Sequence, residues 1–213
     1  MPRRVDHDER RRHIADALVR VAATRGLHAT GMREVAAEAG VSLRLVQYYF
    51  GTKEELLLAA MQQLAAQFGD RVMARIQQTR EEPGRPAAPR DVIAAILTEA
   101  LPANEESRTF TLVYTAYLAL SLTDPALALG PLARNSGIVS DVIAAQLRTA
   151  QAAGDMPASM DPDLEAITLM TMSAGLGTSV IGGQSPPGQA QEVIDYHLRR
   201  LFPHARPRDT GAQ

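Results

Sequence analysis

The fold of the first fifty residues depends on one short stretch, which reads Val35-Ala36-Ala37-Glu38-Ala39-Gly40-Val41-Ser42-Leu43-Arg44-Leu45-Val46-Gln47-Tyr48-Tyr49-Phe50. Ala36 is small enough to let two helices cross closely. Four residues later, Gly40 supplies the positive φ that a tight turn needs. Ser42 can cap the next helix, and Val46 and Phe50 lie one turn apart and return that helix to the core. This register predicts a helix-turn-helix.

The outer face of the second helix in this motif is polar and suits a DNA major groove. With Val46 and Phe50 directed inward, the outward side chains are Leu43, Arg44, Gln47 and Tyr48. Arginine can donate two hydrogen bonds to guanine, and glutamine can pair with adenine through two bonds. The alternative is a plain helical hairpin with incidental polar residues. The agreement of cap, turn and core signals favours DNA binding.

Helical periodicity continues along almost the whole chain and predicts an all-α fold of about nine helices. The expected helices are His7–Arg25, Met32–Ala39, Leu43–Tyr49, Lys53–Arg80, Arg90–Leu101, Glu105–Leu122, Pro125–Ala153, Pro162–Ile181 and Gly188–Phe202. Thr52 is expected to cap the fourth helix, with Glu55 as its capping-box partner. Three prolines make residues 81–89 a loop. The polar residues 204–213 are expected to be disordered.

Composition excludes several classes of protein. Cysteine is absent, which rules out disulfides, thiolate metal sites and cysteine nucleophiles. We find no cluster of His, Asp and Glu at metal-ligand spacing and no phosphate-binding glycine loop. We therefore expect no metal, no cofactor and no enzymatic activity. No apolar run approaches the roughly 18 residues of a membrane span, and the charged N-terminus is not a signal peptide.

Basic residues gather near the N-terminus of the chain. Residues 1–60 hold 10 Arg and Lys against 8 Asp and Glu, whereas the remainder holds 12 against 16. The cluster expected before the first helix is Arg3, Arg4, Arg10, Arg11 and Arg12. These side chains can reach a minor groove or flanking phosphates. The alternative, a solvated terminus, carries equal weight.

Several stretches of residues 11–61 form one specific pattern. They are Ile14-Ala15, Ala17-Leu18, Gly26-Leu27, Val35-Ala36, Ala39-Gly40-Val41-Ser42 and Tyr49-Phe50-Gly51-Thr52-Lys53-Glu54-Glu55-Leu56-Leu57. This pattern resembles the DNA-binding domain of the TetR family of bacterial repressors. The remaining chain more loosely resembles the C-terminal domain of the choline-responsive, BetI-like branch. The stretches concerned are Asp124-Pro125-Ala126-Leu127, Ala153-Gly154-Asp155-Met156, Asp161-Pro162, Glu165-Ala166, Ala174-Gly175-Leu176, His197-Leu198 and Leu201-Phe202.

The resemblance implies which residues contact DNA. Lys53 matches a lysine that contacts a phosphate from the start of the fourth helix, where the helix dipole also favours an anion. The alternative is an ordinary surface lysine. Gly31 stands where the family has threonine, so Thr30 or Arg33 is expected to take that phosphate contact. The expected DNA-binding set is Thr30, Arg33, Ser42, Leu43, Arg44, Gln47, Tyr48, Tyr49 and Lys53. The family favours tyrosine at the position of Gln47, so that contact is open.

The resemblance also implies a second domain that dimerises and binds an effector. We expect a DNA-binding domain at residues 1–52, a domain for effector and dimer at residues 53–203, and a tail at residues 204–213. The expected dimer residues are Ile167, Met170, Ala174, Gly177, Val180, Ile181, Ile194, Leu198 and Leu201. Gly175 and Gly177 would permit close helix contact across such an interface. The alternative is that these residues complete the core of one chain.

Effectors in the family enter a cavity in the helical body. The candidate lining residues are Leu64, Phe68, Phe110, Tyr114, Tyr117, Met170 and Met172, and each is also a plausible core residue. The sequence thus predicts a cytoplasmic, homodimeric repressor that binds a palindromic DNA operator and is released by a small molecule. The alternatives are a helical interaction protein that does not bind DNA, or a small all-α enzyme.

Overall fold

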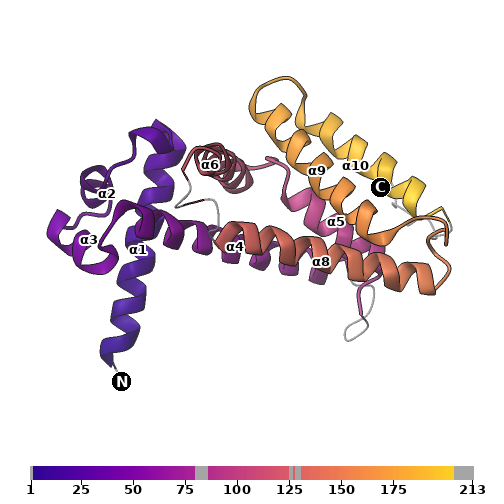
Figure 1. The fold of residues 1–213 in the computed structure, drawn as a ribbon, viewed down its shortest axis with the longest axis horizontal. Helices are drawn as coiled ribbons and strands as arrows, with labels where there is room; N and C mark the ends of the chain where they lie inside the picture. Colours follow the sequence, from indigo (N-terminus) through magenta and orange to yellow (C-terminus); the bar gives the residue numbers. More distant parts are fainter. Residues whose placement is uncertain (1, 80–85, 125–126, 128–130, 204–213) are drawn as a thin grey trace, which may run out of the picture. The chain divides into compact units, whose positions relative to one another are not determined.

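Nine α-helices and one 3₁₀ helix form the described part of the chain, which contains no strand (Figure 1). The computed structural model describes residues 2–79, 86–124, 127 and 131–203, and the side chains of these residues except 2–6 and 131–136. The elements are α1 Pro2–Arg25, η1 Leu27–Ala29, α2 Met32–Glu38, α3 Leu43–Phe50, α4 Lys53–Gln78, α5 Pro89–Glu99, α6 Glu105–Ser121, α8 Pro131–Ala152, α9 Pro162–Ile181 and α10 Pro187–Leu201. The all-α prediction is confirmed.

Three helix starts differ from the expectation, and one of them is that of α10, which begins at Pro187 and not at Gly188. α1 begins at Pro2 and not at His7, so all five arginines of the N-terminal cluster lie within the helix and none precedes it. α5 begins at Pro89, which the sequence assigned to a loop. Proline is favourable there because the first helical residue has no intrahelical use for an N–H.

Some expectations concern residues outside the described ones. They are the loop at residues 81–85, the start of the seventh expected helix at residues 125, 126 and 128–130, and the tail at residues 204–213. The seventh expected helix is described from Pro131 onward as α8.

The chain divides into two compact units that cut across the predicted boundary after residue 52. Unit 1 comprises residues 1–71 and 102–137, and unit 2 comprises residues 72–101 and 138–213. α4 contributes to both units, and α6 belongs to unit 1 although it follows α5 of unit 2. The division into functional domains at residue 52 therefore does not coincide with the division by packing.

The local signals for the helix-turn-helix are confirmed one by one. Gly40 has a φ of 64°, as the turn requires. The Ser42 hydroxyl accepts a hydrogen bond of 3.2 Å from the Leu45 N–H, and the Thr52 hydroxyl accepts one of 3.1 Å from the Glu55 N–H. Each cap satisfies a backbone donor that the first turn of a helix leaves unpaired.

Unit 1 has a single hydrophobic core shared by the helix-turn-helix, α4 and α6. Its members include Ile14 and Leu18 of α1, Val46 and Phe50 of α3, and Leu57 of α4. α1 packs against α2, η1 and α6. The Gln63 amide of α4 also donates a hydrogen bond to the Asp16 carboxylate of α1. The helix-turn-helix is thus held by more of the chain than its own three helices.

Unit 2 is built on α5, α9 and α10, which pack against one another (Figure 1). Its core holds Ile93 and Leu97 of α5, Leu169 of α9, and Ile194 and Leu198 of α10, all at 0% exposure. The buried apolar side chains of these three helices pack mostly against one another. This packing determines which faces of the helices are left exposed.

Tyr117 of α6 is the largest fully buried side chain among the residues whose side chains the structure describes. It lies in the unit 1 core, and its hydroxyl donates a 3.0 Å hydrogen bond to the Leu127 carbonyl oxygen. Burial raises the pKa of Tyr117 above its ordinary value of 10.0, because the phenolate would lose its hydration. The hydroxyl therefore remains protonated when tyrosine in an unfolded chain would ionise.

Tyr117→Phe should make the free energy of unfolding less dependent on pH in the alkaline range. A raised folded pKa gives stability that is complete below pH 10.0 and is lost as pH rises through the folded pKa. We expect the free energy of unfolding of the natural protein to fall more steeply above pH 10.0 than that of the variant. At neutral pH the variant should be less stable by about 1 kcal/mol, because a hydrogen bond is lost. Urea unfolding across this range measures both effects, and parallel pH profiles would contradict the assignment.

Candidate nucleic-acid interface

The two faces of α3 have opposite exposure. Val46 and Phe50 are 0% and 1% exposed, whereas Tyr48 is 74% exposed and Arg44 and Gln47 are also exposed. The outward direction of these three polar side chains is as expected. Leu43 is half-buried and packs against the core of unit 1, so it offers less surface than the sequence suggested. α3 thus presents arginine, glutamine and tyrosine together on one side.

One expected phosphate contact is wrong. Thr30 is 1% exposed, and its hydroxyl donates a 2.9 Å hydrogen bond to the Gly26 carbonyl oxygen. This hydrogen bond closes the turn between α1 and α2, and the side chain does not reach the surface. Gly31 caps α2 without any side-chain hydrogen bond. Arg33, the other alternative, is exposed on the first turn of α2.

The remaining expected contacts lie around the ends of α3. Ser42 is exposed at the N-terminus, with its hydroxyl already engaged as the cap. Tyr49 is half-buried near the C-terminus and packs against the core. Lys53 is the first residue of α4, half-buried, and follows Gly51, whose φ is 62°. A cation at the N-terminus of a helix is unfavourable for that helix and favourable for a bound phosphate.

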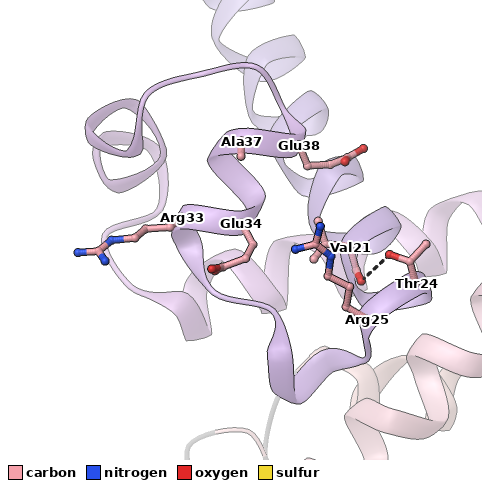
Figure 2. Close-up of a pocket in the computed structure, with 7 residues that line it drawn as sticks. All are labelled: Val21, Thr24, Arg25, Arg33, Glu34, Ala37 and Glu38. Carbon is pink, nitrogen blue, oxygen red and sulfur yellow. Dashed lines mark hydrogen bonds between the residues drawn. The ribbon is translucent and has the colours of Figure 1, made fainter.

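A shallow hollow of about 480 Å³ lies between α1 and α2. It is lined by Val21, Thr24, Arg25, Arg33, Glu34, Ala37 and Glu38 (Figure 2). Arg33 points away from the other labelled side chains, and Glu38 is bound to the Arg20 Nε at 2.7 Å. Small-molecule sites are mostly apolar and enclosed, so this charged hollow is a poor effector site. None of the predicted effector residues lines it.

Three predicted effector residues form an aromatic stack in unit 1. The ring centroids of Phe68 and Phe110 are 5.0 Å apart, and those of Phe110 and Tyr114 are 5.6 Å apart, with interplanar angles of 15° and 8°. The Arg71 guanidinium carbon lies 5.9 Å from the Phe68 centroid and 5.8 Å from the Phe110 centroid. We call these four residues the aromatic cluster.

The other predicted effector residues are not part of this cluster. Leu64 and Tyr117 lie in the unit 1 core at 4% and 2% exposure. Their positions favour the alternative that they are core residues. Met170 and Met172 are half-buried residues of α9 and belong to unit 2.

The predicted dimer set mixes two faces of α9 and α10. Five of its members are buried within unit 2 and are therefore wrong as interface residues, namely Gly177, Val180, Ile194, Leu198 and Leu201. Ile167 and Ala174 are exposed, and Met170 and Ile181 are half-buried. Helical periodicity indicates that both faces of these helices are apolar. Only the packing of unit 2 shows which face is buried and which is exposed.

The exposed apolar residues of α9 and α10 include two that the sequence analysis missed. Leu164 and Tyr196 are 63% and 57% exposed, beside Ile167 at 57% and Val193 at 37%. Leu164, Ile167, Thr171, Ala174 and Thr178 recur at three- and four-residue steps, and all are exposed. We call these five residues of α9 together with Val193 and Tyr196 the α9–α10 face. Their helical spacing was a signal that could have found Leu164.

α9 is also more apolar than the sequence analysis recognised. Residues 162–181 are long and apolar enough to cross a membrane by length and composition alone, with a mean hydropathy of 1.3, and 28% of the window is buried. The expectation that no apolar run approaches the length of a membrane span is wrong for α9, because Ala, Ile, Leu, Met and Val recur along residues 166–181 with no charged side chain between them. The core helix of a soluble protein can pass the same test of length and composition.

Two family models match the chain. Residues 14–60 match the model for bacterial regulatory proteins of the tetR family. Residues 89–203, more than half of the chain, match the model for the C-terminal region of BetI-type transcriptional repressors. The first match covers the helix-turn-helix, and the second covers α5 to α10.

Individual proteins agree with these matches. The HTH-type transcriptional regulator PksA of Bacillus subtilis is 35% identical over 119 residues, which are 56% of this chain and 55% of that protein. The chain thus spans about half the length of this curated relative.

Solved structures cover more of the chain. The multidrug binding protein EbrR, solved with imidazole, is 31% identical, with a TM-score of 0.61 over 92% of this chain and 93% of that one. A protein of Saccharomonospora viridis, solved in complex with choline, is 23% identical, with a TM-score of 0.79 over 92% and 98% of the two chains. The latter comparison concerns the fold alone.

Proposed function

The chain belongs to the TetR family of bacterial regulatory proteins, and we propose that it is a homodimeric transcriptional repressor whose hold on DNA is relieved by a small molecule. The observation that carries the proposal is the division of α3 into a buried face and an exposed face with Arg44, Gln47 and Tyr48. An exposed helix with these side chains fits the width of a major groove. Its relatives are regulators and not enzymes. As a regulator of genes it would act in the cytoplasm.

Contacts with phosphates would orient the protein, and contacts with base edges would select the sequence. Lys53 at the start of α4 and Arg33 on α2 lie on the two sides of α3 in the chain and are the proposed phosphate ligands. Arg44 and Gln47 are the proposed readers of guanine and adenine. Tyr48 and Tyr49 would contact the backbone or a thymine methyl group.

The α9–α10 face is the proposed dimer interface. Exposed apolar side chains on adjoining helices mark a surface that a partner covers. A second copy of the same face would form a four-helix interface with twofold symmetry. Such a dimer would place two copies of α3 about one DNA turn apart, on a palindromic operator.

The aromatic cluster is the proposed effector contact, and its charge favours one class of molecule. The guanidinium of Arg71 already lies over Phe68 and Phe110, so a quaternary ammonium ligand would meet a like charge at these rings. A planar neutral or anionic molecule would instead extend the stack without meeting this repulsion. Choline, which the Saccharomonospora viridis structure contains, is therefore not the proposed ligand.

α4 offers a route by which an effector could act on DNA binding. It begins at Lys53, beside the recognition helix, carries Phe68 and Arg71, and continues into unit 2. An effector that favours one position of α4 would favour one spacing of the two recognition helices. DNA and effector would then weaken each other's binding by the same factor.

Selection of bound sequences from random DNA tests the function directly. The natural protein should enrich two inverted half-sites with centres about 10 base pairs apart. Arg44→Ala and Gln47→Ala should each relax the preference at one base pair per half-site and weaken binding by about 1–3 kcal/mol. Arg108→Ala, which removes an exposed charge on α6, is the matched control and should keep the full preference. Failure to enrich any sequence would refute the proposed function.

Ile167→Asp should convert the dimer to a folded monomer, because a buried carboxylate at the centre of the α9–α10 face would lose its hydration. Sedimentation velocity gives the mass, and circular dichroism checks that the helices persist. Leu122→Asp is the control, since Leu122 is 87% exposed and lies on unit 1. A dimer that tolerates Ile167→Asp as well as Leu122→Asp would place the interface elsewhere.

Choline should raise the melting temperature of the natural protein no more than sodium chloride at equal ionic strength. Arg71→Leu removes the charge that opposes a cation at the aromatic cluster, so any stabilisation by choline should be larger in this variant. Benzoate, a planar anion, should stabilise the natural protein more than it stabilises Arg71→Leu. A specific rise with choline in the natural protein alone would reverse the assignment of charge.

A further inference from the structure

α3 ends without a cation of its own. Its last turn contains no basic residue, although a positive charge there would offset the partial negative charge of the final carbonyl groups. An eight-residue helix is also too short to persist by hydrogen bonding within itself. The orientation of its C-terminal half must therefore come from neighbouring elements.

Arg11 of α1 supplies the missing cation. Its guanidinium donates a hydrogen bond to the Tyr49 carbonyl oxygen, one of the last carbonyl groups of α3. The same guanidinium carbon lies 4.4 Å from the centroid of the buried Phe50 ring. One planar group thus satisfies a backbone acceptor and contacts an aromatic face, a combination that lysine cannot reproduce.

His7 lies one helical turn before Arg11 and extends the same contact. The His7 and Tyr49 rings have centroids 4.7 Å apart, and the Tyr49 and Tyr48 rings have centroids 5.3 Å apart in an edge-on arrangement. A row of three rings therefore runs from α1 to Tyr48, which is among the most exposed side chains of α3. The row limits the rotamers that both tyrosines can adopt.

We infer that Arg11 and His7 are positioning residues, which hold the C-terminal half of the recognition helix and its two tyrosines in the orientation that reads DNA. The inference rests on the proposed function, because it concerns how α3 is presented to an operator. It differs from a phosphate contact by Arg11, because the guanidinium is engaged within the protein. Arg12, the next residue, is exposed and serves as a control with the same charge.

The first measurement does not need DNA. Amide hydrogen exchange of residues 48–52 should become faster in Arg11→Gln than in the natural protein, and should be unchanged in Arg12→Gln. Arg11→Lys should lie between the two, since lysine keeps a donor but loses the planar contact. Unchanged exchange in Arg11→Gln would overturn the inference even if the natural protein binds its operator as proposed.

The second measurement separates positioning from direct contact. The natural protein and the variants are titrated with the selected operator and with scrambled DNA at several salt concentrations. Arg11→Gln should weaken operator binding about tenfold relative to Arg108→Gln, which removes the same charge from an exposed position of α6, with equal affinity of the two variants for scrambled DNA. Its salt slope should match that of Arg108→Gln. An equal loss on both DNAs, with a slope lower by about 0.9, would mean a phosphate contact and overturn the inference.

His7→Ala tests whether operator affinity can fall without a loss of folding stability. It removes the stack from an exposed position of α1 and leaves the Arg11 contacts with Tyr49 and Phe50 in place. Operator affinity should fall by less than in Arg11→Gln, while the urea midpoint and the affinity for scrambled DNA stay at their natural values. No loss of operator affinity in this variant would remove His7 from the assignment. If the natural protein selects no sequence, the proposed function fails and the exchange measurement still decides the role of Arg11.

Discussion

The burial of Val46 and Phe50 is the constraint on which the recognition surface depends. Both residues are almost fully enclosed in the core of unit 1, and on an eight-residue helix this determines which side chains face outward. Arg44, Gln47 and Tyr48 are exposed because the opposite positions are anchored. The caps at Ser42 and Thr52 and the turn at Gly40 then set where the helices begin.

The same core explains why α6 matters to the DNA-binding end of the chain. Tyr117 of α6 lies in one cluster with residues of α1 and α3, and the aromatic cluster joins α6 to α4 through Phe68 and Phe110. A molecule that displaces these rings would disturb helices that also contact the recognition motif. The proposed effector contact and the proposed DNA contact therefore share one core within unit 1.

The helix-turn-helix could be predicted from the sequence because its signals are local. A small residue, a glycine, a cap and two apolar residues at fixed spacing suffice for residues 35–50, and all were confirmed. The predictions that failed depended on tertiary contacts. The Thr30 side chain points inward and donates a hydrogen bond to Gly26. Ile194 and Leu198 are buried where α10 packs against α5 and α9, so they cannot contact a partner. The bond of Arg11 to a carbonyl 38 residues away has no counterpart in helical periodicity.

Because α6 packs into the core of unit 1, it limits how the DNA-binding helices of this protein can be joined to the body of a relative. A chimera that joins the first 52 residues to the body of a relative would separate Leu18 and Phe50 from Val113 and Tyr117, which belong to the same core. The graft would leave a cavity or an overpacked contact at the seam, and each costs stability in a close-packed interior. Transplanting the DNA specificity of this protein therefore calls either for moving residues 53–71 and 102–124 along with it, or for exchanging only the exposed side chains of α3.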